Sequence, residues 1–278
     1  MRDLFLFEAG STKTDVVYLI DGERKESSLP GFNPNRESTE FLDAFNSFES
    51  ITKNAIVFFY GSGLGSDENK NVVRELFGFL NSGQIQIYDD ILGGARAAFN
   101  NSPGIVCIMG TGGLAAYYDG KNIVKRRGGY GYLIDDLGGG FELGKRIIAS
   151  WLNDDLSEDC IKALQASVNM DKRAFLKEIY QTKNLKLIAS ISKSLADLKD
   201  ESLQKVVDHY LEDFFTYNVL PLTKEFNLDN FSIIGSIGTG YYKSIRKQSD
   251  RQGLQLDQCI QSPAQRLFDY HNQKGKPI

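Results

Sequence analysis

The sequence predicts an α/β protein with two similar halves, and two observations carry that prediction. A short apolar run, a glycine-rich turn, a β-rich run, an Asp-Gly pair and a returning strand follow one another within residues 4–29, and the same order recurs within residues 105–125. Strand-like and helical segments alternate after the first of these units. The recurrence indicates an internal duplication. Strands separated by helices favour a parallel extension of each sheet.

The first half is expected to begin with the element order βββαβα and to end with a further strand and a short helix. Its hairpin signal is Asp21-Gly22, because an Asp-Gly pair between two strand-like runs is typical of a tight β-turn. Apolar residues recur at helical spacing in two later segments. In chain order we expect strands at 4–7, 14–20 and 23–29, a helix at 37–50, a strand at 55–60, a helix at 67–80, a strand at 84–88 and a helix at 91–99.

The second half repeats the hairpin unit and then departs from the first. Residues 141–225 are expected to form a helical insertion, and Ser262-Pro263 to begin a terminal helix, with Ser as N-cap and Pro at the first helical position. We therefore expect one domain at 1–102, on which a helix at 262–278 packs back, and a second at 103–261. The other expected elements are strands at 105–109, 114–118 and 122–125, a strand at 231–234, a helix at 238–251 and a strand at 254–260.

Composition indicates an ordinary globular protein. Of the 278 residues, 41% are hydrophobic and 24% charged, and the formal net charge is −4. With no dense basic run beyond residues 125–127, nucleic-acid binding is not expected. No apolar run approaches the roughly 18 residues that span a bilayer, so we expect a cytoplasmic protein without a membrane partner. The widely spaced Cys107, Cys160 and Cys259, and only two histidines, argue against a disulfide framework or a transition-metal site.

Two glycine-rich turns are candidates for phosphate binding. Residues 10–14 and 110–113 each follow a buried strand, where glycine lets a phosphate approach the backbone amides and Ser, Thr or Lys adds further donors. Either turn alone is compatible with a simple tight turn, whereas the duplicated pair favours phosphate binding. A third turn, residues 61–65, lacks the acidic partner of a dinucleotide site and is interpreted as a structural or substrate-side loop.

Carboxylates are expected at the ends of several strands. Asp89-Asp90 follows the strand at 84–88, Asp135-Asp136 precedes a glycine run, and Glu8 ends the first strand. Such groups can activate a hydroxyl or hold Mg²⁺ against phosphates. The structural alternative is a surface acid or, for Asp90, a helix N-cap.

Taken together, these motifs resemble the BadF/BadG/BcrA/BcrD ATPase family, which includes N-acetylglucosamine kinases and belongs to the actin/hexokinase/Hsp70 superfamily. Residues 8–14 are similar to its first phosphate motif and residues 108–113 to its second. Residues 90–95 resemble its catalytic-base segment, residues 128–139 its G-G-W-G…D-E-G-S block, and residues 233–237 its adenosine motif. The resemblance implies two ribonuclease H-like, actin-like lobes with a helical insertion in the second.

The resemblance also implies an activity, an ATP-dependent kinase for N-acetylglucosamine or a related amino sugar or hexose, using ATP and Mg²⁺ and forming a homodimer. Asp90 would be the general base that accepts a proton from the sugar hydroxyl. The other implied roles are ATP binding by Gly10, Ser11, Thr12, Lys13, Thr14, Thr111, Gly112, Gly113, Gly235 and Ser236, sugar binding by Asn33, Asp90, Gly112 and Asp136, and metal binding by Glu8 and Asp136.

Two other hypotheses stay open, and departures from the family pattern support the first of them. Glu8 stands where the family has Asp, Leu137 and Gly139 replace Glu and Ser, and Tyr130 replaces Trp. The first alternative is therefore a catalytically weak nucleotide- or sugar-binding relative, a sensor or binding module. The second is an activator ATPase of the same family, which would share an iron–sulfur cluster between subunits and need two suitably placed cysteines per chain.

Overall fold

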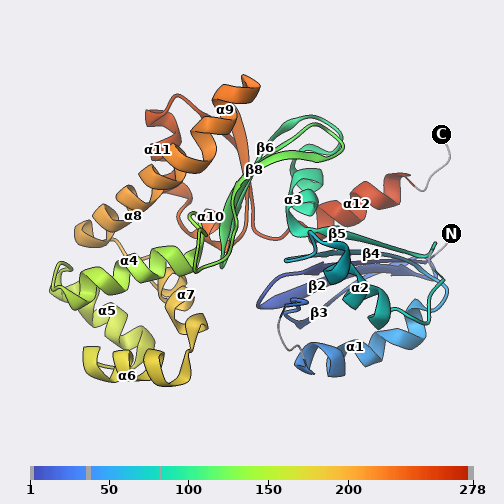
Figure 1. Ribbon diagram of the computed structural model, residues 1–278, viewed down its shortest axis with the longest axis horizontal. Coiled ribbons are helices and arrows are strands. Elements are labelled where there is room, and N and C mark those ends of the chain that lie inside the picture. Colours follow the sequence, from blue (N-terminus) through green and yellow to red (C-terminus); the bar gives the residue numbers. More distant parts are fainter. Residues whose placement is uncertain (1–2, 36–38, 82, 275–278) are drawn as a thin grey trace. The chain divides into compact units, whose positions relative to one another are not determined.

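The computed structural model describes residues 3–35, 39–81 and 83–274 (Figure 1). Parts of the helices expected at 37–50 and 262–278 lie outside these residues. The chain divides into two compact units. The first contains the described residues up to Ser102, Gly120–Asn122 and those from Ser262 onward, and the second contains Pro103–Asp119 and Ile123–Gln261.

The first unit is built on a five-stranded mixed sheet in the order β3-β2-β1-β4-β5. Only β2 runs against the other strands, because the hairpin turns β1–β2 and β2–β3 are antiparallel while β4 and β5 are added in parallel. The parallel addition of β4 and β5 is what the helix-separated strands favoured. The strands are β1 Leu4–Ala9, β2 Lys13–Ile20, β3 Glu23–Pro30, β4 Ile56–Gly61 and β5 Ile85–Asp89.

Helices cover both faces of the first sheet because its central strand is apolar on both sides. Phe5 and Phe7 of β1 pack into the core under α1 (Thr39–Thr52) and α2 (Asp67–Leu76). Leu4 and Leu6 point the other way, into the core that includes α3 (Asp90–Phe99) and α12 (Ala264–Lys274). Alternate side chains of a strand point to opposite faces, so this strand is buried on both.

The second unit has a sheet of the same design, in the order β10-β9-β6-β7-β8. Again only the middle hairpin strand, β7, is antiparallel to its neighbours. The internal duplication predicted from the sequence is therefore present in the topology. The strands are β6 Gly104–Met109, β7 Gly113–Tyr118, β8 Ile123–Gly128, β9 Asn230–Ile234 and β10 Gln255–Ile260.

A helical segment lies between β8 and β9, as the insertion predicts, and Figure 1 shows it as a group of helices beside the second sheet. Its core is large and apolar, with Trp151 and Phe214 fully buried. The segment contains α4 Gly140–Leu152, α5 Glu158–Val168, α6 Lys172–Thr182, α7 Leu185–Ser194, α8 Glu201–Phe214, a π-helical turn at Phe215–Val219 and α9 Leu220–Phe226.

The structure differs from the sequence prediction in the helix expected at 238–251. Two helices form instead, α10 Ser236–Gly240 and α11 Tyr242–Arg251. They separate at Tyr241, whose backbone (φ −107°, ψ 22°) leaves the helical region. The Tyr241 side chain is buried and its hydroxyl donates to the Ser192 carbonyl oxygen at 2.5 Å. Tertiary packing of this residue thus overrides the local helical pattern.

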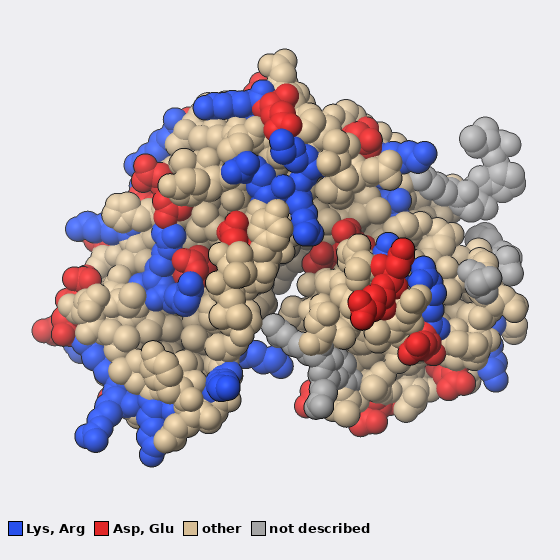
Figure 2. Space-filling view, in the orientation of Figure 1, with Lys and Arg blue, Asp and Glu red and all other residues tan. Residues whose placement is uncertain are grey.

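In the described part of the chain, no helix is both long enough and apolar enough to cross a membrane. Acidic and basic side chains are interspersed on the face shown in Figure 2. The strand β8 carries three consecutive basic residues at the sheet edge, Lys125, Arg126 and Arg127, and charged side chains on an edge strand hinder pairing with another chain.

Candidate active site

Three loops of the first unit meet at one edge of its sheet. The parallel strands β1, β4 and β5 end in register, with Ala9 beside Gly61 and Gly61 beside Asp89. The loops that follow are the first glycine turn, the turn at residues 61–65 and the start of α3. In open α/β sheets this carboxyl edge is where ligands bind.

The first glycine turn is tight and closely packed. The Gly10 amide donates to the Lys13 carbonyl oxygen at 2.9 Å. A Cβ built on Gly31 would lie 2.5 Å from the Ser11 carbonyl carbon, so only glycine at position 31 lets the loop after β3 approach the turn. Thr12 and Lys13 are exposed, which leaves their donors accessible to a ligand.

Thr14 lies differently from its neighbours in the turn. Its side chain is fully buried, and its hydroxyl donates to the Pro30 carbonyl oxygen at 3.0 Å. That bond ties β2 to the end of β3. The hydroxyl of Thr14 therefore stabilises the hairpin behind the turn rather than facing outward with Thr12.

Asp89 and Asp90 have separate structural roles. Asp89 is the N-cap of α3, because its carboxylate accepts from the Leu92 amide at 3.0 Å. The N-cap alternative for Asp90 is therefore wrong, and the carboxylate of Asp90, at the first helical position, hydrogen-bonds the Ser62 side chain. Burial, together with the charge of Asp89, raises the pKa of Asp90 to about 6.

Glu8 adds a second carboxyl group near Asp90. Burial first, and then the charges of Asp90 and Asp15, raise the pKa of Glu8 to about 8, while Lys13 acts in the opposite direction. Lys13 itself pairs with Asp15 at 2.5 Å. Since Asp90 ionises at the lower pH, its charge opposes ionisation of Glu8. At neutral pH the first unit thus presents an ionised Asp90 beside a protonated Glu8.

Asn33 lies close to the turn at residues 61–65. Its side-chain oxygen accepts from the Asn35 amide at 2.9 Å, and a Cβ built on Gly63 would lie 3.5 Å from that oxygen. The Phe32 amide donates to the Gly10 carbonyl oxygen at 3.2 Å. The loop bearing Asn33 is therefore held between two of the three loops at this edge.

The second unit builds its glycine turn against another glycine run. The Gly110 amide donates to the Gly112 carbonyl oxygen at 3.1 Å, and the Gly140 amide donates to Gly110 at 2.8 Å. A Cβ on Gly113 would lie 2.3 Å from the Gly139 amide nitrogen. The backbone at Gly113 packs directly against the backbone at Gly139, so neither position has room for a side chain.

Gly235 and Asp136 approach the same turn. Gly235 has φ +121°, and a Cβ there would lie 2.5 Å from the Met109 carbonyl oxygen. Asp136 accepts from the Gly131 amide at 3.3 Å. A Cβ on Gly112 would lie 2.9 Å from the Asp136 carboxylate. The second unit therefore brings Thr111, Gly112, Gly113, Asp136, Gly235 and Ser236 to the carboxyl ends of β6 and β9.

Sequence reasoning missed three residues that complete the first unit's edge. Ser62 hydrogen-bonds Asp90, Gly31 permits the close packing of the first turn, and Asp15 pairs with Lys13 and accepts from the Ser262 hydroxyl at 2.8 Å. The glycine-rich character of residues 61–65 was a usable signal for Ser62. The sequence contains no signal for Asp15, because an acidic residue in a strand is ordinarily interpreted as a solvated surface side chain.

The three cysteines are buried or half-buried. Within the residues that the structure describes, no group of three His, Cys, Asp or Glu side chains could hold a metal ion. Cys107 and Cys160 are buried, which gives no accessible pair of thiols for a shared cluster. Burial raises the pKa of the half-buried Cys259 to about 11, so it too remains a thiol at neutral pH.

Comparisons with known proteins define the fold. No family model and no curated protein matches the sequence. A ROK family glucokinase from Streptomyces griseus, solved with glucose and AMPPNP, superposes with TM-score 0.59 over 97% of this chain and 98% of that one, at 12% identity. A protein provisionally named N-acetylglucosamine kinase, from Chromobacterium violaceum, gives 0.72 over 97% and 99%, at 17% identity.

The chain thus has the α/β fold of the actin-like ATPases, with two ribonuclease H-like lobes, as the sequence predicted. A more similar structure comes from Porphyromonas gingivalis and is also provisionally named an N-acetylglucosamine kinase. It gives TM-score 0.85 over 99% of this chain and 100% of that one, at 26% identity. The resemblance to the BadF/BadG/BcrA/BcrD family stays a prediction.

Proposed function

We propose that this protein is an ATP-dependent kinase that phosphorylates a hydroxyl group of a small sugar, N-acetylglucosamine or a related amino sugar or hexose. The placement of Asp90 carries the proposal. Its carboxylate lies at the carboxyl edge of a sheet, beside a glycine turn. Asp89 caps the N-terminus of α3, so the carboxylate of Asp90 is not needed for that purpose. Similarity over the whole length to the Porphyromonas gingivalis protein supports the choice of an amino sugar.

The pair of carboxyl groups suits general-base catalysis. A pKa of about 6 leaves Asp90 mostly ionised at neutral pH and still able to take a proton. In the proposed step the sugar hydroxyl gives its proton to the Asp90 carboxylate as its oxygen attacks the γ-phosphorus of ATP, and ADP leaves. Glu8, protonated at the same pH, adds no second negative charge next to the incoming phosphate. Two carboxyl groups with pKa values pushed apart are a recurring pattern in acid–base sites.

The glycine turns are proposed to bind the nucleotide. Their backbone amides and the exposed donors of Thr12 and Lys13 suit phosphate oxygens, since phosphoryl transfer depends mainly on positioning and charge neutralisation. Thr14 would act indirectly, by fixing the hairpin. The proposed ATP-binding residues are Gly10, Ser11, Thr12, Lys13, Thr111, Gly112, Gly113, Gly235 and Ser236. The sugar is proposed to contact Asn33, Gly112 and Asp136. We also propose that one lobe consists of residues 1–102 with the terminal helix and that the other consists of residues 103–261.

Mg²⁺ is the metal ion proposed to accompany ATP. Bound Mg²⁺ would neutralise phosphate charge, and Glu8 and Asp136 are its proposed ligands. A bound divalent cation would favour the ionised form of Glu8, against the effect of burial. The second candidate function is a nucleotide- or sugar-binding relative with weak catalysis, and the replacement of the family's Asp by Glu8 is the observation that favours it.

A coupled ADP-release assay with Mg·ATP tests the proposal across N-acetylglucosamine, glucosamine, glucose and N-acetylmannosamine. Sugar-dependent turnover is expected, and the preferred sugar identifies the substrate class. Asp90→Asn should remove turnover by at least about a hundredfold, the scale of general-base contributions. Asp43→Asn, an exposed acid on α1, is the matched control and should retain it.

The outcomes separate the two candidates. ATP binding without sugar-dependent ADP release would reject the kinase and favour the binding relative. Full turnover by Asp90→Asn would reject Asp90 as the base even if the chain is a kinase.

A further inference from the structure

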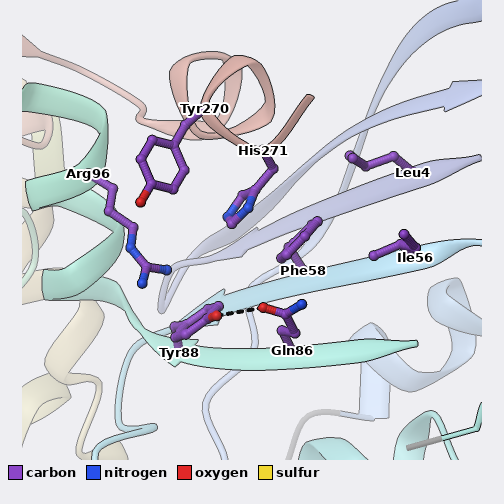
Figure 3. A pocket seen from close by; sticks show the side chains of 8 residues that line it. All are labelled: Leu4, Ile56, Phe58, Gln86, Tyr88, Arg96, Tyr270 and His271. Carbon is purple, nitrogen blue, oxygen red and sulfur yellow. Dashed lines mark hydrogen bonds between the residues drawn. The ribbon is translucent and has the colours of Figure 1, made fainter. Parts of the chain in front are cut away.

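A cavity of about 290 Å³ lies in the first unit, away from the loops described above. It is on the sheet face that α3 and α12 cover, and its walls come from β1, β4, β5 and those two helices. Figure 3 shows Arg96 reaching from α3 to one end of it, while Leu4 and Ile56 lie at the other. None of its lining residues is among the candidate residues for ATP, sugar or metal.

The cavity has an apolar end and a polar end. Leu4, Ile56 and Phe58 form the apolar surface, and the His271 ring stacks on Phe58 with centroids 3.5 Å apart. Arg96, Tyr88 and Gln86 form the polar end, where the Tyr88 hydroxyl donates to the Gln86 side-chain oxygen at 2.6 Å (Figure 3). A ligand that fills this space must be amphipathic.

Arg96 supplies a positive charge to the polar end, and its described partners are neutral. Its guanidinium donates to the Tyr60 hydroxyl at 2.7 Å and lies 4.3 Å from the centre of the Tyr88 ring. Within residues 3–35, 39–81 and 83–274, no carboxylate forms an ion pair with it. Its Nε is buried and has no hydrogen-bond partner.

Neutral side chains surround the half-buried guanidinium. The tyrosine ring faces and hydroxyl attract the guanidinium, yet a half-buried charge is best stabilised by an opposite charge with good hydrogen-bond geometry. An anion in the cavity would supply that opposite charge.

We propose that this cavity binds a small organic anion, a carboxylate or phosphate carried on a compact apolar or ring-shaped body. The anionic head is placed at Arg96 and Gln86, and the body lies against Phe58, Leu4 and Ile56. The cavity volume of about 290 Å³ lies just below the roughly 300–1,000 Å³ found for ligand pockets, which limits the body to about the size of one ring. The proposal does not rest on the kinase activity.

The chain carries a built-in reporter for this site. It has two histidines, of which His271 lines the cavity and His209 is exposed on α8 in the second unit. Ring resonances of the ¹⁵N-histidine-labelled full-length protein are assigned with His209→Gln. Phenylacetate and phenyl phosphate are then titrated in separate experiments, which show whether the site prefers a carboxylate or a phosphate head group. Benzyl alcohol is the control that has the ring without the charge. Inorganic phosphate is the control that has the charge without the ring.

We expect saturable shifts of the His271 resonance with phenylacetate, phenyl phosphate or both, while His209 stays in place as the internal reference. Benzyl alcohol and inorganic phosphate should bind at least about tenfold more weakly, since each lacks one half of the interaction. Absence of any shift with either organic anion, or equal affinity for benzyl alcohol, would overturn the proposal.

A charge variant makes the test specific. Gln86 is exposed, so Gln86→Glu should fold normally and keep the acceptor for Tyr88 while placing a negative charge beside the ligand. The dissociation constant should rise at least about tenfold through like-charge repulsion. Gln181→Glu adds the same charge on α6, outside the cavity, and should change nothing. Equal binding by Gln86→Glu and the wild-type protein would refute the placement of the head group.

Discussion

Replacing Glu8 by glutamine should remove a large part of the pH dependence of folding stability. Glu8 ends β1, and burial is the main reason that its pKa rises from an ordinary 4.5 to about 8. Glutamine keeps the size and the polar character of the side chain but has no proton to lose. The comparison therefore isolates the free energy of ionising one carboxyl group in the folded state.

The direction of the pKa change determines whether folding stability rises or falls with pH. The folded state holds the Glu8 proton more tightly than the unfolded state, so stability is fully present below pH 4.5 and is lost as pH rises towards 8. Each pH unit in that window removes up to about 1.4 kcal/mol, and the whole window corresponds to about 5 kcal/mol. We expect at least about 2 kcal/mol of this in a measurement, because water entry and the Lys13 charge offset part of the cost.

Denaturant unfolding at about pH 5 and about pH 9, in the absence of divalent ions, measures the effect. The free energy of unfolding of Glu8→Gln should fall less between the two conditions than that of the wild-type protein. Glu26→Gln, an exposed substitution on β3, is the control. Its free energy of unfolding should change between the two pH values as much as that of the wild-type protein. An equal change in the free energy of unfolding for wild type and Glu8→Gln would show that Glu8 is not buried in its protonated form.

Three further predictions concern the proposed reaction and the packing. For the kinase, kcat/KM should fall as pH drops through about 6, because a protonated Asp90 cannot accept a proton; a rate independent of pH across that value contradicts the assignment. Gly113→Ala should destabilise the protein by about 3 kcal/mol in thermal unfolding, since its Cβ meets the Gly139 backbone at 2.3 Å, whereas Gly65→Ala, in open space, should not. Leu267→Ala should cost about 2–5 kcal/mol by circular dichroism, because Leu267 is fully buried in the first unit; an unchanged transition would mean that α12 is not needed there.

The fold could be predicted because its signals are local and repeated. Buried strands such as β1 and β6 are short apolar runs that end in glycine, and both hairpins have an Asp-Gly turn. Helical periodicity located α1, α2 and the insertion to within a few residues. These patterns depend on the period of apolar side chains and on turn chemistry, which a single sequence displays directly.

The arrangement of the site could be predicted only in part. Asp90 was found from its place after a strand, but the division of roles between Asp89 and Asp90 depends on which carboxylate meets the Leu92 amide. The raised pKa of Glu8 arises from burial and from charges brought close by the sheet. The break at Tyr241 likewise follows from a hydrogen bond to Ser192 on a distant helix. Each of these is a tertiary effect, and sequence periodicity carries no information about it.

The position of α12 has a consequence for the order in which the protein assembles during synthesis. Leu267 and Phe268 complete the core beneath β1, yet the ribosome makes them after the entire second unit. The first hundred residues emerge with one face of their sheet covered only in part, by α3, and they cannot reach their final packing as an independent folding unit. The second unit, whose residues are contiguous except for a short excursion at Gly120–Asn122, has no such dependence. The half that is translated first is therefore the half that finishes last, and until then its exposed apolar strands are the part most open to misassembly.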